Sequence, residues 1–86
     1  MIIKMAKEIS TRKIDNEIFI FNRKMSTIHT LNKIGSFIWD LLEQNIPADD
    51  IPAHIAGRFE VEKETAQSDL IEFLDELKEN HLIIIE

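Results

Sequence analysis

The residues from 8 to 31 follow the period of extended strands, in which successive side chains point to opposite faces. In "EIFIFN" isoleucines and phenylalanines fall on opposite faces, a composition typical of a central strand with both faces covered. The pattern predicts a three-stranded antiparallel meander. Its strands are expected at residues 8 to 14, 17 to 22 and 26 to 31, with turns at Asp15-Asn16 and at "NRKM", residues 22 to 25.

The apolar spacing becomes helical directly after the third strand, with Asn32 as a suitable N-cap. A short second helix and a long third helix follow, and the apolar run "LIII" near the C-terminus predicts a short strand or strap. The fold class is therefore α+β, with a three-stranded antiparallel sheet followed by three helices, and the whole arrangement is winged helix-turn-helix-like. The helices are expected from residue 32 to the Pro47 region, near 49 to 58, and near 62 to 80.

Length and composition indicate one domain over residues 1 to 86. The chain contains no cysteine, which fits a reducing compartment, and no window approaches a membrane span, so we expect a cytoplasmic protein without membrane contact. Its charge is distributed unevenly between the N-terminal part and the rest of the chain. Residues 1 to 24 carry six basic and three acidic side chains, whereas residues 25 to 86 carry four basic and thirteen acidic ones.

No constellation of catalytic residues is present. His29, His54 and His81 fall on three different elements without metal-ligand spacing, and the two glycines lie inside helical patterns rather than in a phosphate-binding loop. We therefore expect a non-enzyme without cofactor or metal.

The third strand has the character of an unprotected sheet edge, because it contains neither lysine nor proline. An edge of this kind can accept another strand. The candidate docking residues are Ser26, Thr27, Ile28, His29 and Thr30. The alternative is that "LIII" or the N-terminal "MIIKM" covers this edge.

A second candidate surface lies on the long helix. Ile71 stands about 120° from the centre of the predicted core stripe, so the core need not bury it. The residues predicted to form the helical wall of a peptide groove are Gln67, Ile71 and Leu74.

"HTLNKIGSFIWDLLE" and "DDIPAHIAGRFEVEKETAQSDLIEFLDELKENHLI" together resemble the coenzyme PQQ synthesis protein D (PqqD) family over roughly residues 8 to 84. One departure is the hairpin "FNRKMSTIHTLN", which lacks the glycine common in such turns. The matching positions are Leu31-Asn32, Gly35, Ile38-Trp39-Asp40-Leu41-Leu42, Phe59, Asp69, Phe73-Leu74 and Leu77.

The resemblance implies a peptide chaperone, or RiPP recognition element. Such a protein holds the leader of a ribosomally made precursor peptide for a modifying enzyme, typically a radical SAM protein. In that family the leader adds as a strand to the third strand and lies against the third helix. These features imply the same partners for this chain. We separately expect it to be a monomer or homodimer.

Two alternatives remain open from the residues. The order of the second and third helices also suits a winged-helix DNA-binding protein, although residues 62 to 80 carry seven acidic side chains against Lys63 and Lys78, a sign that repels phosphates. A homodimer that exchanges N-terminal strands is the second alternative. We expect no binding of nucleic acid.

Overall fold

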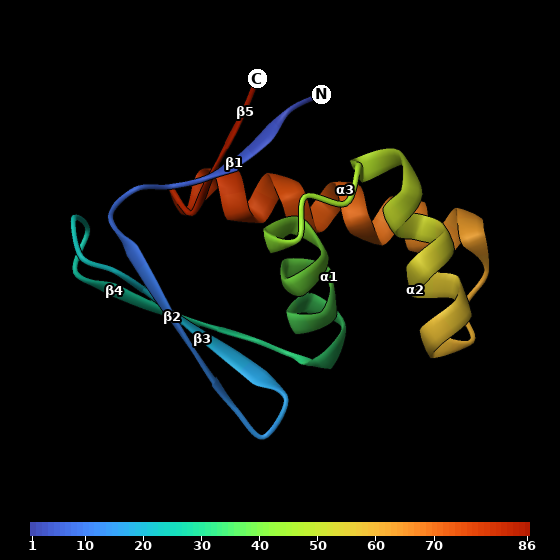
Figure 1. Ribbon diagram of the computed structural model, residues 1–86, viewed down its shortest axis with the longest axis horizontal. Helices are drawn as coiled ribbons and strands as arrows, with labels where there is room; N and C mark the ends of the chain where they lie inside the picture. The colour runs from blue at the N-terminus through green and yellow to red at the C-terminus, as the bar shows by residue number, and fades with distance from the viewer.

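The computed structural model describes all 86 residues and contains two small sheets and three α-helices (Figure 1). Strands β2, β3 and β4 form an antiparallel sheet with β3 in the middle, and β1 pairs with β5. The predicted α+β fold is confirmed, and its order of elements is compatible with a winged helix. In chain order the elements are β1 (Ile3–Met5), β2 (Ile9–Ile14), β3 (Glu17–Asn22), β4 (Thr27–Leu31), α1 (Lys33–Glu43), the 3₁₀ turn η1 (Ala48–Asp50), α2 (Ile51–Phe59), α3 (Lys63–Glu79) and β5 (Ile83–Ile85).

The two hairpin turns set the register of the sheet. Asp15 and Asn16 have φ angles of 50° and 68°, as a two-residue type I′ turn requires. The second turn ends at Ser26, whose φ is 55°, and β4 begins at Thr27. The prediction that Ser26 belongs to the third strand is therefore wrong, because its backbone is left-handed rather than extended.

Only one face of β3 is covered. Ile18 and Ile20 are buried beneath the helices, whereas Phe19 is half-buried and Phe21 is 37% exposed on the opposite face. The prediction that both faces are covered is wrong, because all three helices lie on one side of the sheet (Figure 1).

Helix α1 follows β4 after a single residue. The Asn32 side chain accepts a hydrogen bond from the Gly35 backbone N–H at 2.8 Å, which confirms the predicted N-cap. The α1 side chains Ile38, Trp39 and Leu42 are buried in the core. The helix therefore packs on more than one side, with the sheet on one and α2 on the other (Figure 1).

Asn32→Ala tests the cap. We expect it to lower the free energy of unfolding by about 1 kcal/mol, because the first turn of α1 loses the acceptor for one of its unpaired N–H groups. Urea denaturation measures the effect, with Asn80→Ala at the C-terminus of α3 as the control. An unchanged midpoint would contradict this role for Asn32.

Helices α2 and α3 complete the cover of the core. Pro52 occupies the first turn of α2, where its missing N–H has no helical partner. The buried residues of α3 are Ala66, Leu70, Leu74 and Leu77. None of the three helices combines the length and the apolar character needed to cross a membrane.

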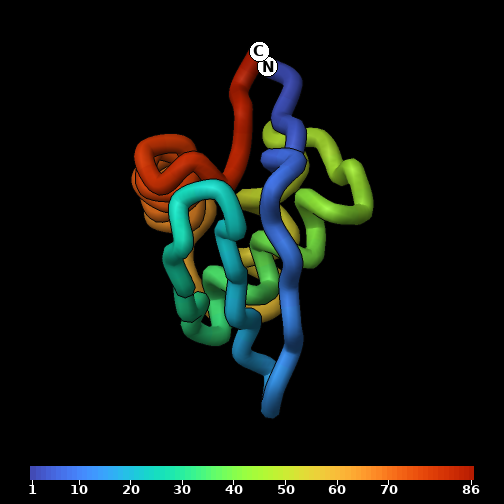
Figure 2. Tube along the Cα trace, turned by 90° about the vertical axis from the view of Figure 1, so that its left-hand side faces the viewer, coloured from blue at the N-terminus to red at the C-terminus, as the bar shows by residue number.

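The two ends of the chain lie side by side (Figure 2). β1 and β5 are antiparallel, with Ile3 opposite Ile85. Beyond them Ile2 and Glu86 exchange backbone hydrogen bonds of 2.9 and 2.7 Å. The terminal segments therefore cover each other, and the alternative in which one of them covers β4 is wrong.

Candidate functional site

The edge of β4 is free and carries no protective residue. β2 and β4 form the two edges of the three-stranded sheet. β2 contains Arg12 and Lys13, charges of the kind that prevent an edge from pairing with another chain, whereas β4 is "TIHTL". β4 is therefore the edge that can accept an added strand.

The turn between β2 and β3 shows which way the backbone groups point. Ile14 and Glu17 flank a two-residue turn, so they form a hydrogen-bonded pair, and alternate residues of β3 point their N–H groups to opposite neighbours. The bond from the Arg23 N–H to the Glu8 carbonyl, 2.8 Å long, fits this alternation on the β2 side. The residues of β3 whose N–H groups point toward β4 are Ile18, Ile20 and Asn22.

The same alternation fixes the orientation of β4. The residues of β4 opposite these three are Leu31, His29 and Thr27. They direct their backbone groups toward β3, so Ile28 and Thr30 direct their N–H and C=O groups to the open edge. Ile28 is also 64% exposed. These two residues supply the main-chain groups that an incoming strand can pair with.

Ser36 ties the end of β4 to α1. The Ile18 N–H donates to Ser36 Oγ at 2.9 Å, and the Ser36 hydroxyl donates to the Leu31 carbonyl at 3.1 Å. The Ser36 hydroxyl thus bridges the last pair of the β3–β4 ladder. Since Ser36 is only 2% exposed, these hydrogen bonds are shielded from water and hold the edge strand in place.

A surface hollow lies beside the end of β4, between the start of α1 and one flank of α3. Figure 2 shows α3 next to β4, on the side of the sheet away from β2. The hollow, which we call the α3 hollow, is lined by Asn32, Ile34, Gly35, Ile38, Asp69, Glu72, Phe73 and Glu76.

Gly35 allows α3 to come close to α1 at the α3 hollow. A Cβ atom on Gly35 would lie 3.2 Å from Phe73 Cε1 and 3.3 Å from Asn32 Oδ1, distances at which the neighbours must shift. The small residue therefore sets the depth at which the Phe73 ring sits.

The α3 hollow combines apolar and acidic character. Ile34, Ile38 and Phe73 provide apolar surface, and α3 contributes three carboxylates without any basic side chain. An extended peptide on the β4 edge would direct alternate side chains toward this hollow. Apolar or cationic side chains match it.

The structure brings together part of the predicted strand site. Thr27, Ile28, His29 and Thr30 lie on β4, and the His29 ring is 3.1 Å from Thr27 Oγ1 (Nε2 to Oγ1) on the face toward the helices. Ser26 lies in the preceding turn. No three His, Asp or Glu side chains converge where they could hold a metal ion.

The three residues predicted on the long helix do not line the α3 hollow. Leu74 is 4% exposed and belongs to the core, while Gln67 and Ile71 are exposed. At 100° per residue Ile71 stands about 160° around the helix axis from Phe73. Binding through Gln67, Ile71 and Leu74 stays a prediction. These residues do not lie on the flank of α3 that borders β4.

The residues on that flank are not recognisable as a binding surface from the sequence pattern. In the sequence, Asp69 and Phe73 stand out only as positions of the resemblance, and Glu72 and Glu76 only by their charge. The sequence signal for this flank was the family resemblance, in which Asp69 stands four residues before Phe73.

The fold is shared with solved structures of other proteins. TbiB1 in complex with the TbiA(beta) leader peptide is 29% identical over 93% of each chain, with a TM-score of 0.89. Lasso peptide synthetase B1 complexed with the leader peptide is 21% identical and has a TM-score of 0.92, and the match covers 99% of this chain and 100% of that chain. The second likeness concerns the fold alone. A comparison with curated protein sequences finds no match.

A family model agrees with the resemblance found in the residues. The model described as coenzyme PQQ synthesis protein D (PqqD) matches residues 17–83, from the start of β3 to the first residue of β5. This span includes β4, α1 and α3, the elements that form the free edge and the α3 hollow. The chain belongs to the coenzyme PQQ synthesis protein D (PqqD) family.

Proposed function

We propose that this chain is a RiPP recognition element that binds the leader of a ribosomally made precursor peptide and presents it to a modifying enzyme. The leader adds to β4 as a fourth strand. The observation that carries this proposal is the free, unprotected edge of β4 beside the α3 hollow. The family match and the leader peptide named in the TbiB1 complex support it.

Main-chain hydrogen bonds supply the affinity of binding, and side-chain contacts supply the selectivity. Ile28 and Thr30 offer N–H and C=O groups to the leader, and alternate leader side chains enter the α3 hollow. β4 runs directly into α1, and the hydrogen bonds of the Asn32 and Ser36 side chains hold this junction, which keeps the edge rigid. A rigid edge lowers the entropy that binding must overcome.

The domain, residues 1 to 86, acts by binding and not by catalysis. Its partners are the precursor peptide and a radical SAM or other peptide-modifying enzyme, and it works in the cytoplasm as a monomer or homodimer. The family match and the TbiB1 complex with a leader peptide support the peptide and enzyme partners.

DNA binding is the less favoured function. A winged-helix protein binds DNA through a basic surface, because phosphate contacts supply most of the affinity. α3 carries acidic side chains along the flank beside β4, with Asp69, Glu72 and Glu76 together. A surface of this sign repels duplex DNA.

Selection from a phage library of random 20-residue peptides tests the proposal. We expect binders with a β-forming segment, and we expect bound peptide to slow hydrogen exchange at the Ile28 and Thr30 amides by about tenfold or more, because these N–H groups become hydrogen-bonded. Two-dimensional NMR measures each amide. Thr27 and His29, whose N–H groups already bond to β3, serve as controls. Unchanged exchange at Ile28 and Thr30 in a saturated complex would place the docking surface elsewhere.

A further inference from the structure

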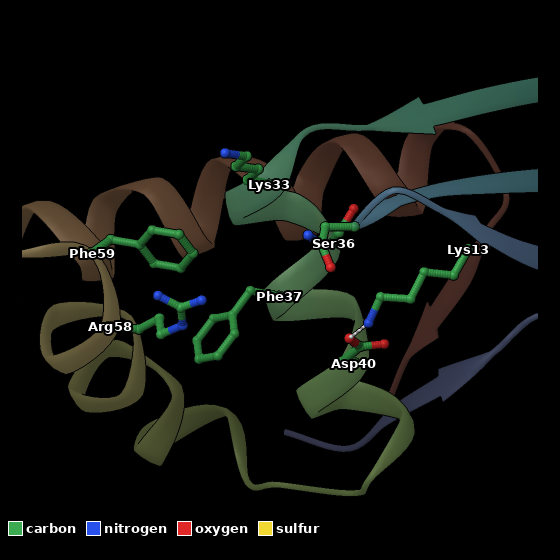
Figure 3. Close-up of a pocket in the computed structure, with 8 residues that line it drawn as sticks. Lys13, Lys33, Ser36, Phe37, Asp40, Arg58 and Phe59 are labelled. Carbon is green, nitrogen blue, oxygen red and sulfur yellow. Dashed lines mark hydrogen bonds and ion pairs between the residues drawn. The ribbon is translucent and has the colours of Figure 1, made fainter.

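A second hollow lies on the opposite flank of α1 from the α3 hollow, between α1, the end of α2 and the β2–β3 hairpin. Figure 3 shows its lining, with cations from three elements and two aromatic rings. Its volume is ≈ 200 Å³. We call it the basic hollow. The residues used below are Lys13, Lys33, Phe37, Asp40, Arg58 and Phe59.

The charges of the basic hollow are not balanced within the chain. Lys13 forms an ion pair of 2.9 Å with Asp40. Lys33 and Arg58 have no carboxylate within 4.0 Å, although the chain has sixteen acidic residues and a net charge of −6. Two exposed cations therefore border one hollow without an anionic partner.

Aromatic rings form one wall of the basic hollow. Phe37 and Phe59 meet edge to face, with centroids 5.3 Å apart, and both are half-buried. The Arg58 guanidinium carbon lies 5.4 Å from the centre of the Phe59 ring, a cation–π contact that orients it. This apolar wall keeps water from one side of the hollow, so an anion against it is less screened than on an open surface.

The basic hollow begins two residues after the end of the proposed docking edge. Asn32 lines the α3 hollow, and the next residue, Lys33, lines the basic hollow. A peptide strand paired with Ile28 and Thr30 leaves the edge at Leu31. At about 3.3 Å per extended residue, the next two or three peptide residues reach Lys33.

We propose that the basic hollow is a second subsite for the same precursor peptide and takes an aspartate or glutamate side chain from the segment that flanks the docking strand at the Leu31 end. Lys33 and Arg58 bind the carboxylate, and Phe37 and Phe59 contact its aliphatic stem. This inference rests on the proposed function, since the docked strand delivers the segment. It adds an acidic requirement at a fixed distance from the strand.

The test uses peptides selected from the random phage library on the unmodified protein. We expect the binders to carry Asp or Glu a fixed two to four residues from the β-forming segment. Fluorescence anisotropy then measures their binding to the double variant Lys33→Gln/Arg58→Gln and to the control Lys63→Gln/Lys78→Gln, which removes two exposed cations from α3. We expect about tenfold weaker binding to the first and unchanged binding to the second, because charge-assisted hydrogen bonds are lost only there.

A peptide in which the selected acid is replaced by its amide completes the experiment. The amide peptide should bind the parent about tenfold more weakly than the acid peptide does. Its affinity for the double variant should equal its affinity for the parent. Binders without acid enrichment, equal binding to parent and double variant, or an equal loss on the control variant would each overturn the subsite. These results differ from a failure of strand docking, in which the selection yields no binders or Ile28→Pro binds them as well as the parent. Either of those results overturns the subsite too.

Discussion

Ile28→Pro and Thr30→Pro are expected to leave the protein folded and to weaken peptide binding by about 1 to 3 kcal/mol each, roughly 5- to 150-fold in Kd. Proline removes the N–H that each residue directs to the open edge of β4, while the ladder to β3 uses the alternate residues. The peptide carbonyl opposite then has no donor. Ile28→Ala and Thr30→Ala keep the N–H and should bind nearly as the parent does.

Proline at the other edge of the sheet provides a matched control. Thr11 on β2 lies opposite Ile20 in a pair without direct hydrogen bonds, so its N–H also points away from the sheet. Thr11→Pro makes the same chemical change on an edge that does not border the α3 hollow. It should bind peptide as the parent does.

Proline within the ladder should have the opposite effect. Thr27 and His29 direct their N–H groups to β3, so Thr27→Pro and His29→Pro should lower stability instead. Circular dichroism and urea denaturation separate folded from unfolded variants, and anisotropy with a library-selected peptide measures binding. If folded Ile28→Pro and Thr30→Pro variants both retain full affinity, main-chain pairing on β4 is disproved.

The sheet and helices were predictable because local signals agreed with the fold. Period-two alternation, the turn residues Asp15 and Asn16 and the cap Asn32 each act within a few residues. The same local signals allowed the edge character of β4 to be predicted, since missing lysine and proline are visible in the residues themselves. Which residues of β4 direct their backbone N–H groups to the open edge was not predictable, because it depends on the register of the sheet.

Other predictions failed where the answer depends on tertiary arrangement. Phe19 and Phe21 have the composition of a covered strand, yet no element of the chain lies over that face. The periodicity of α3 predicts which of its residues face the core. It does not predict which of the two sides next to this core-facing stripe borders β4, because that depends on where the sheet packs. Ile71 is an exposed apolar residue on the other flank of α3, whereas the flank beside β4 carries Phe73 and carboxylates.

Ser36 is the clearest example of a role that sequence patterns do not reveal. A serine in a helix is usually exposed, and nothing near Ser36 indicates that its hydroxyl replaces a backbone partner of β3 and β4. The bridge exists only because α1 follows β4 after one residue. Burial of the helix then brings Ser36, at the end of the first turn of α1, against the end of the ladder.

Ser36→Ala is expected to lower the free energy of unfolding by about 2 to 4 kcal/mol, a large fraction of the roughly 5 to 15 kcal/mol typical of a small domain. The methyl group fits the same space but leaves the Ile18 N–H and the Leu31 carbonyl without their bridging hydroxyl. Each buried group that loses its partner costs about 1 to 3 kcal/mol, and partial relaxation of the strand end offsets some of that cost.

Ser68→Ala is the control for the change from serine to alanine within a helix. Ser68 is exposed on α3 and makes no side-chain hydrogen bond, so its replacement should alter stability by less than about 0.5 kcal/mol. Urea denaturation gives both values, and hydrogen exchange at the Ile18 amide reports the bridge directly. We expect this amide to exchange faster in Ser36→Ala and at the parent rate in Ser68→Ala. Equal stability of the two variants, with an Ile18 amide as protected as in the parent, would show that the hydroxyl does not hold the end of β4.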